Sequence, residues 1–161
     1  MKSWLHEMTV LLACGLAGVV FAQGTPHRED EVRTRGADVM PFALADTVHI
    51  FEKTPTGGVQ QVRARAGDPD QVLMIRVHLL SIADSFATRD FSGPAHVHGD
   101  AMPGLAELRN AKKDDVTVTF YKLADGAEIA YVGATPEIRD AIHRWFDAQL
   151  ADHGHDATRT W

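Results

Sequence analysis

One order of elements, strand then turn then strand then helix, occurs twice along this chain of 161 residues. In the first unit, residues 47–51 are β-branched and alternate, residues 55–58 read Pro-Thr-Gly-Gly, and residues 59–64 alternate again. This pattern predicts a β-hairpin. Between residues 72 and 86, apolar side chains then recur at the spacing of one helix face, so a helix is expected to follow the hairpin.

The second unit repeats this order. Residues 116–121 and 127–132 both have strand patterns, and the Asp-Gly pair at 125–126 is a strong hairpin signal. An apolar stripe over residues 138–150 predicts the second helix.

Both predicted helices have signals at their N-termini. Asp68 or Asp70 can cap the first helix, and Thr135 followed by Pro136 suits the start of the second. Neither unit can bury its apolar face alone, so we expect two helices on one face of a shared antiparallel sheet. The predicted fold is a single α+β domain with a tandem β-hairpin–helix repeat (ββαββα); the alternative is that the two units are alike by coincidence.

Residues 1–22 have the layout of a secretory signal peptide. A short segment with one lysine precedes an apolar run over residues 9–21, and Val20 and Ala22 occupy the −3 and −1 positions of a cleavage site. The run is too short to span a bilayer as a helix. We therefore expect a periplasmic or secreted protein, with lipoprotein anchoring at Cys14 or an N-terminal core helix as alternatives.

Cleavage after Ala22 leaves a chain without cysteine, because Cys14 is the only one. In that chain we predict a mobile leader at residues 23–38, a single α+β domain at 39–153 and a flexible tail at 154–161. The net charge of −6 argues against a nucleic-acid partner, which requires a concentrated basic face. No later segment is apolar enough to predict a membrane span.

The long connection between the two units contains His96 and His98. On an extended segment both imidazoles would point to the same side and form a chelate for copper, zinc or nickel, with Met102 as a thioether ligand that favours Cu(I). A solvated loop is the alternative. His153 and His155 lie in the polar tail, for which weak metal binding or disorder is expected.

Three more histidines stand where the fold can gather them. His78 and His143 lie beside the apolar stripes of the two predicted helices and align with each other in the repeat. His49 alternates with Phe51 and is therefore predicted on the buried face of its strand, where it needs a metal or a polar partner. Met40 is an additional soft ligand. Each of these side chains can instead be an ordinary core residue.

A set of short motifs runs in order along nearly all of the mature chain. The motifs are Arg35-Gly36, Met40-x-Phe42, Thr47 to Phe51, Thr56 to Gly58, Ile75 to Leu79, Asp90-Phe91, Val97-His98, Pro103-Gly104, Ala141 to His143, Gln149 and His153. As a set they resemble a group of small exported bacterial proteins with an R-G-x-x-x-M-x-F stretch and a T-x-H-x-F strand.

The resemblance implies a shortlist of residues rather than a chemistry. Met40, His49, His78, His98 and His143 fall on the pattern of the group, whereas His96 and Met102 do not. Two further histidines of that pattern are replaced here by isoleucine and serine, at positions 50 and 81. Members of the group are often named aspartate carbamoyltransferases, but this chain lacks the Ser-Thr-Arg-Thr-Arg phosphate-binding motif of that enzyme, so the activity is not supported.

The leading hypothesis is a periplasmic metal-binding protein that uses a cluster of histidines, with copper preferred over zinc or haem. Imidazole and thioether ligands without thiolate suit copper better than calcium or magnesium, and no Cys-x-x-Cys-His motif attaches a haem. The candidate ligands are His49, His78, His98, His143, Met40 and His96.

Two other classes of function remain open. The first is a small exported enzyme in which His78 or His143 is a general base, although no serine lies in a Gly-x-Ser-x-Gly frame. The second is a non-catalytic binding or scaffold module, or a homodimer, that uses the sheet face carrying Val59, Gln61 and Tyr121.

Overall fold

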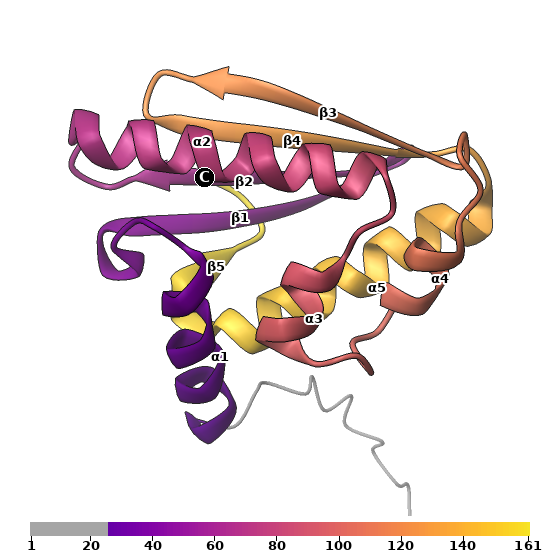
Figure 1. Cartoon of the computed structure of the whole chain (residues 1–161), viewed down its shortest axis with the longest axis horizontal. Coiled ribbons are helices and arrows are strands. Elements are labelled where there is room, and N and C mark those ends of the chain that lie inside the picture. Colours follow the sequence, from indigo (N-terminus) through magenta and orange to yellow (C-terminus); the bar gives the residue numbers. More distant parts are fainter. Residues whose placement is uncertain (1–25) are drawn as a thin grey trace, which may run out of the picture.

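The computed structural model describes residues 26–161, which form an α+β arrangement with a five-stranded mixed sheet and five α-helices (Figure 1). The predicted signal peptide at residues 1–22, including Cys14, lies outside the described residues. No helix in residues 26–161 is long and apolar enough to cross a membrane.

The two predicted hairpins are confirmed. β1 (Thr47–Thr54) pairs antiparallel with β2 (Gly57–Ala64), and β3 (Val116–Leu123) pairs antiparallel with β4 (Gly126–Gly133). An antiparallel pairing of β2 with β4 joins the hairpins into one sheet of order β3-β4-β2-β1-β5. The last strand, β5 (Ala157–Thr158), is parallel to β1, so the sheet is mixed rather than purely antiparallel.

The two long predicted helices are present with the expected caps. In α2 (Pro69–Ala87), the Asp68 carboxylate accepts a hydrogen bond at 2.9 Å from the N–H of the second helical residue. In α5 (Pro136–His153), the Thr135 hydroxyl accepts from the N–H of Ile138 at 3.4 Å. Proline follows each cap, where its missing N–H leaves no helix bond unmade.

Further elements surround this framework and differ from the expected arrangement. The connection between the units forms α3 (Ser92–His98) and α4 (Leu105–Asn110), and α1 (Pro26–Val39) occupies most of the predicted mobile leader. Short 3₁₀ turns, η1 (Leu44–Asp46) and η2 (Gly154–Asp156), precede β1 and β5. Residues 154–158 of the predicted flexible tail therefore carry η2 and β5.

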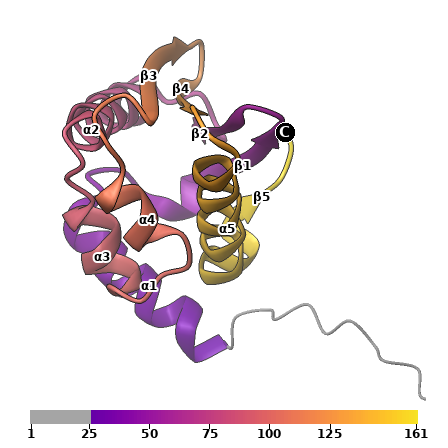
Figure 2. The ribbon, with the colours of Figure 1, turned by 90° about the vertical axis from the view of Figure 1, so that its right-hand side faces the viewer.

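The simple ββαββα repeat is not confirmed, and the helices are not all on one face of the sheet. α2 packs mainly on β3 and β4, α5 packs on β1, β2 and β4, and α1 contacts α3 and α5 (Figure 1). Viewed from the side, α2 and α5 stand apart with α4 between them (Figure 2). The reason is that the connection has apolar residues of its own to bury: Phe91, Val97, Leu105 and Leu108 are all at most 3% exposed.

The core lies between the sheet and the two long helices. Trp145 and Phe146 of α5 and Phe51 of β1 are among its largest fully buried side chains. The rings pack edge to face, with Tyr131 and Trp145 centred 5.5 Å apart and Phe51 and Phe146 centred 5.4 Å apart. This packing fixes the wall of the cavity described next.

Candidate functional site: a histidine-lined cavity

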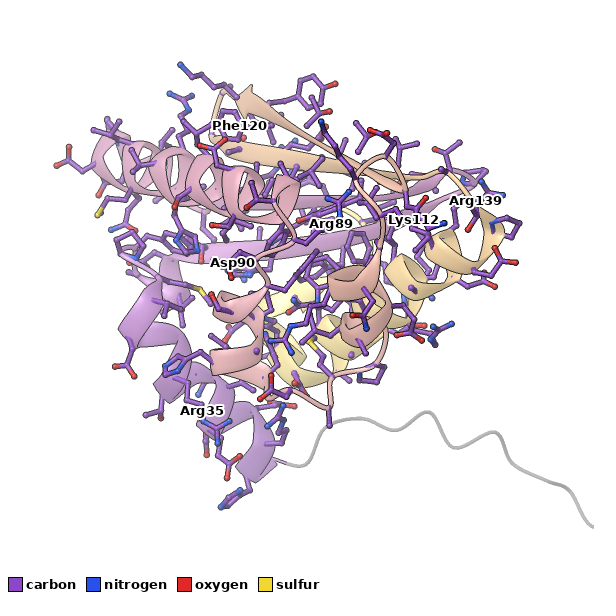
Figure 3. All side chains as sticks on the ribbon, turned by 45° about the vertical axis from the view of Figure 1, so that its right-hand side comes forward. Arg35, Arg89, Asp90, Lys112, Phe120 and Arg139 are labelled. Atoms are coloured by element: carbon purple, nitrogen blue, oxygen red, sulfur yellow. The ribbon has the colours of Figure 1, made fainter. Side chains whose placement is uncertain are left out.

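A cavity of about 280 Å³ lies where α2, α3 and α5 meet β1, β2 and the segment that follows α1. Its inner walls are buried side chains, whereas exposed residues, including Ser81, Asp90 and Ser92, lie at its rim. Asp90 is seen in Figure 3 between the end of α2 and the start of α3. The cavity is therefore built from segments that are far apart in the chain.

The floor of the cavity follows from the register of β1 and β2. His49 lies opposite Val62, and Phe51 lies opposite Gln60, so all four side chains are on the same face of the sheet. This confirms the prediction that His49 is on the buried face of its strand, where it is 4% exposed.

The wall contributed by α5 is a stripe at helical spacing. Trp145, Gln149 and His153 follow one another at i, i+4 and i+8, so they project from the same side of the helix. Gly154 ends the helix with a positive φ of 53°, which glycine adopts without the steric strain of a side chain. His153 is thereby held as the last residue of α5.

Three imidazoles gather at one end of the cavity. The ring of His153 is centred 4.9 Å from the ring of His49 and 5.1 Å from the ring of His98. All three residues are at most 9% exposed. His153 therefore stands between a histidine from β1 and a histidine from α3.

The buried position of His49 keeps its imidazole neutral. Burial lowers the pKa of His49 to about 4; Asp156 opposes this, and His78 and His98 add to it. At neutral pH the ring therefore carries one N–H and one lone pair, and the lone pair can bind a metal ion.

The pKa of His153 is also lowered well below its ordinary value. Burial is the main cause, with His49 and His98 adding to it and Asp152 opposing it. Burial lowers the pKa of His78 as well. Burial thus keeps His49, His78 and His153 neutral at pH 7.

Asp152 fixes the orientation of His98. The Nδ1 atom of His98 lies 2.8 Å from Oδ2 of Asp152. Arg28 of α1 donates to the same oxygen at 2.7 Å and to Oδ1 at 3.1 Å. Burial acts to raise the pKa of Asp152, but hydrogen bonds from His98 and Arg28 outweigh it and hold the value at about 2. With Nδ1 engaged by the carboxylate, Nε2 of His98 is the nitrogen left for a ligand.

Several polar atoms of the cavity lack partners. Among the residues that the structure describes, His49 Nε2, Trp145 Nε1 and Gln149 Oε1 are buried without a hydrogen bond, and all three residues line the cavity. A buried polar group left unpaired costs roughly 1–3 kcal/mol. Three such groups around one space can be satisfied by a polar guest, of which water is the simplest.

The structure brings four of the six predicted ligands to this cavity. Met40, His49, His78 and His98 all line it. His78 is set apart from the three clustered rings and packs edge-on against Phe42, with ring centres 5.5 Å apart.

The other two predicted ligands are elsewhere. His143 Nε2 lies 3.0 Å and 2.8 Å from the carbonyl oxygens of Thr54 and Gly57, so the ring holds the turn between β1 and β2. His96 is exposed and lies 3.9 Å from a carboxylate oxygen of Asp38. The expectation that His96 and His98 share a side required an extended segment, but α3 is a helix, in which residues two apart diverge.

Sequence reasoning missed three residues of the site. His153 was placed in the tail, Arg28 in the leader, and Asp152 was not considered. The signal that could have found His153 is its spacing of four from Gln149, on the same helical stripe as Trp145.

As the side chains stand, residues 26–161 contain no group of three or more His, Cys, Asp or Glu residues that could hold a metal ion. The three clustered imidazoles are near one another without converging on a single point.

Fold and site together define an α+β protein with a buried, histidine-lined cavity. Comparison of the chain with protein-family models, with curated proteins and with solved structures gives no match.

Proposed function

We propose that this protein binds a transition-metal ion, with copper as the first candidate, through His49, His98 and His153. The observation that carries the proposal is the set of ring separations, 4.9 Å and 5.1 Å, around the buried and unpartnered His49 Nε2. Two imidazoles that bind one tetrahedral ion through nitrogen at about 2.0 Å hold their ring centres roughly 5 Å apart. Rotation of the rings, rather than movement of the backbone, would bring the nitrogens together.

The environment of the three rings favours a metal. Ligand nitrogens must be deprotonated, and burial already keeps His49 and His153 neutral. Asp152 accepts a hydrogen bond from His98, and a carboxylate is the usual outer partner of a histidine ligand.

The donor set favours copper over the hard cations. Three imidazoles, with the Met40 thioether on the same cavity, are soft or intermediate ligands, whereas calcium and magnesium prefer oxygen. Zinc accepts imidazole too, and the experiment below separates the two metals.

Calorimetric titration of dialysed protein with Cu(I), Cu(II) and Zn(II) tests the proposal. We expect one ion per chain, bound at least roughly tenfold more weakly by a His49→Ala/His153→Ala variant. The matched control is His96→Ala/His155→Ala, which removes two exposed histidines and should leave the affinity unchanged. The absence of binding, or equal loss in both variants, would exclude the histidine cluster as a metal site.

The proposed location is the periplasm or the exterior of the cell, and it rests on the signal-like pattern of residues 1–22. Mass spectrometry of the protein from a periplasmic fraction should give a mature N-terminus at Gln23. An unprocessed N-terminus, or a lipid-modified Cys14, would contradict the proposed cleavage after Ala22.

A small exported enzyme is the second candidate, and one observation favours it. The hydrogen bond from His98 to Asp152 is the arrangement that orients a general base towards a substrate. His98 therefore replaces His78 and His143 as the proposed base. Ester hydrolysis that persists after chelation and falls in both His98→Gln and Asp152→Asn would support the enzyme; no activity on a panel of p-nitrophenyl esters would count against it.

A further inference from the structure

We propose that the end of the cavity next to Trp145 and Gln149 binds a small uncharged organic molecule that both accepts and donates hydrogen bonds, as a primary carboxamide does. This inference concerns the same cavity as the proposed metal site but does not require a metal.

The first support is a donor and an acceptor one helical turn apart. Trp145 Nε1 can only donate, and Gln149 Oε1 can only accept. Both atoms are buried without a partner, in residues that are 1% and 5% exposed. A guest that accepts from the indole and donates to the amide satisfies both atoms at once.

The second support is that these groups are held in place. The Trp145 ring packs edge to face against Phe86, Phe91 and Tyr131, with ring centres 5.6 Å, 6.1 Å and 5.5 Å away. Because the ring cannot swing without breaking these contacts, the indole N–H is fixed relative to the cavity. Fixed polar groups bind a guest without loss of side-chain freedom.

A third polar group faces the cavity from the sheet. The Tyr131 hydroxyl donates to Gln60 Oε1 at 2.7 Å, and this bond leaves the NH₂ group of the Gln60 amide as a donor. Burial raises the pKa of Tyr131 well above its ordinary value, so its hydroxyl keeps its proton. The orientation of the Gln60 amide is thereby set by the protein.

The remaining walls indicate the apolar part of the guest. Phe51, Val62, Leu79 and Phe86 line the cavity, and each is at most 2% exposed. Mostly apolar walls with a few placed polar groups are typical of small-molecule sites, and about 280 Å³ is close to the lower limit of roughly 300 Å³ for such sites. The guest is therefore small.

The charges of the lining exclude an anion. Of the side chains in the described chain that line the cavity, none is lysine or arginine, and the carboxylate of Asp90 is at the rim. A buried carboxylate guest would have no counter-charge, and an unpaired buried charge is strongly disfavoured.

Three probes of nearly equal shape test the inference: benzamide, benzoate and acetophenone. Only benzamide is uncharged and has both a donor and an acceptor. Titrations followed by calorimetry, with EDTA present, should show benzamide binding at least tenfold more tightly than either of the other two probes.

Two variants probe the recognising groups, and each has a matched control. Trp145→Phe and Gln149→Met should each weaken benzamide binding at least tenfold. Trp161→Phe and Gln61→Met alter residues that do not line the cavity, so they should leave the affinity for benzamide unchanged. Near-ultraviolet circular dichroism of each variant identifies any that does not fold, and either cavity variant alone is sufficient for the test.

The outcomes separate clearly. No benzamide binding at millimolar concentration, equal binding of all three probes, or equal weakening by cavity and control variants overturns the inference. If copper binds and benzamide does not, this inference alone fails. If benzamide binds and copper does not, the proposed metal function alone fails.

Discussion

His49 shows how a single residue position decides the chemistry of the cavity. On a strand, a shift of one position moves a side chain to the other face of the sheet. His49 and Phe51 therefore face the helices, and Ile50 faces the opposite side. Burial disfavours the protonated form of this histidine, and this makes the fold sensitive to acid.

The folded protein should lose stability between pH 6.5 and pH 4 because of His49. The unfolded chain takes up a proton near pH 6.5, whereas the folded chain does so only near pH 4. The free energy of unfolding therefore falls by about 3 kcal/mol over this range and is unaffected by this group above it. Urea unfolding at pH 7 and pH 4 should show this loss in the native chain and much less of it in His49→Leu.

His96→Leu is the control for this prediction, because His96 is exposed. The free energy of unfolding of His96→Leu should match that of the native chain at pH 7 and at pH 4. If His49→Leu loses as much stability on acidification as the native chain does, the burial of a neutral His49 is not the cause.

At the residue scale, the periodicity of the sequence predicts which side chains are buried, but it does not predict which distant residues they contact. The alternation around His49 correctly placed it on the inner face. Nothing local in the sequence shows that His98 and His153 approach His49. The three residues are 49 or more positions apart, and their contact depends on how α3 and α5 pack. The role of His143 was equally hidden, since its partners are backbone carbonyls.

At the scale of elements, Arg28 makes the shortest hydrogen bonds between α1 and the site. Arg28 donates to the carbonyl oxygen of His98 at 2.6 Å and to both carboxylate oxygens of Asp152. Arg35, on the same helix (Figure 3), adds a longer bond to the carbonyl of Val97 at 3.4 Å. α1 thus rests on α3 and α5 beside the clustered histidines.

Arg28→Gln should loosen α1 without unfolding the domain. Hydrogen bonds to charged groups contribute about 1.5–3 kcal/mol each, so we expect a loss of about 2 kcal/mol in stability. Hydrogen exchange of the amides in residues 26–39 should become faster. Arg33→Gln, which removes exposed ion pairs, is the control; similar exchange in both variants would contradict this assignment.

Gly104 allows α4 to lie close to α5. Its φ is 80°, and a β-carbon there would collide with the carbonyl oxygen of Ala141. Gly104→Ala should therefore lower the free energy of unfolding by at least about 2 kcal/mol, from backbone strain and the clash together.

Gly93→Ala provides the comparison for Gly104. Gly93 lies in α3 with open space around its α-carbon, so alanine there should leave stability unchanged or raise it by up to about 1 kcal/mol. Chemical denaturation of both variants checks the pair. Equal stability of the two variants would show that α4 and α5 are not in close contact.

The elements with strong periodicity were predictable and the others were not. Both hairpins and both long helices were read from spacing, turn residues and caps. α1 is mostly polar, and α3 and α4 have only seven and six residues, so their helical character depends on the surfaces they pack against. β5 has two residues, too few for any pattern.

At the scale of the whole molecule, β5 covers the edge of the sheet at the site. It pairs with β1 at His49 and Ile50, so the backbone of β1 is bonded on both sides at these residues. Beyond β5, the Trp161 ring lies 4.8 Å from the guanidinium of Arg63 on β2. The chain therefore closes over the strand that carries His49.

Deletion of residues 157–161 should weaken this strand. The lost ladder bonds correspond to about 1–2 kcal/mol, and copper and benzamide should both bind more weakly because His49 is less well held. Deletion of residues 159–161 alone, which retains β5, should have the smaller effect. Thermal unfolding and calorimetry of both truncated chains distinguish strand pairing from the general effect of shortening the chain.

The cavity draws its walls from residues 39–62, from residues 78–98 and from residues 145–153. A ribosome-bound or fragmentary chain that ends before α5 lacks the wall that carries Trp145, Gln149 and His153. Because His153 stands between His49 and His98, the cavity and its histidine cluster are complete only after synthesis has reached the final helix. Only a chain that has folded completely would therefore bind a guest in the cavity. A bound guest would stabilise the folded state by contacting both β1 and α5.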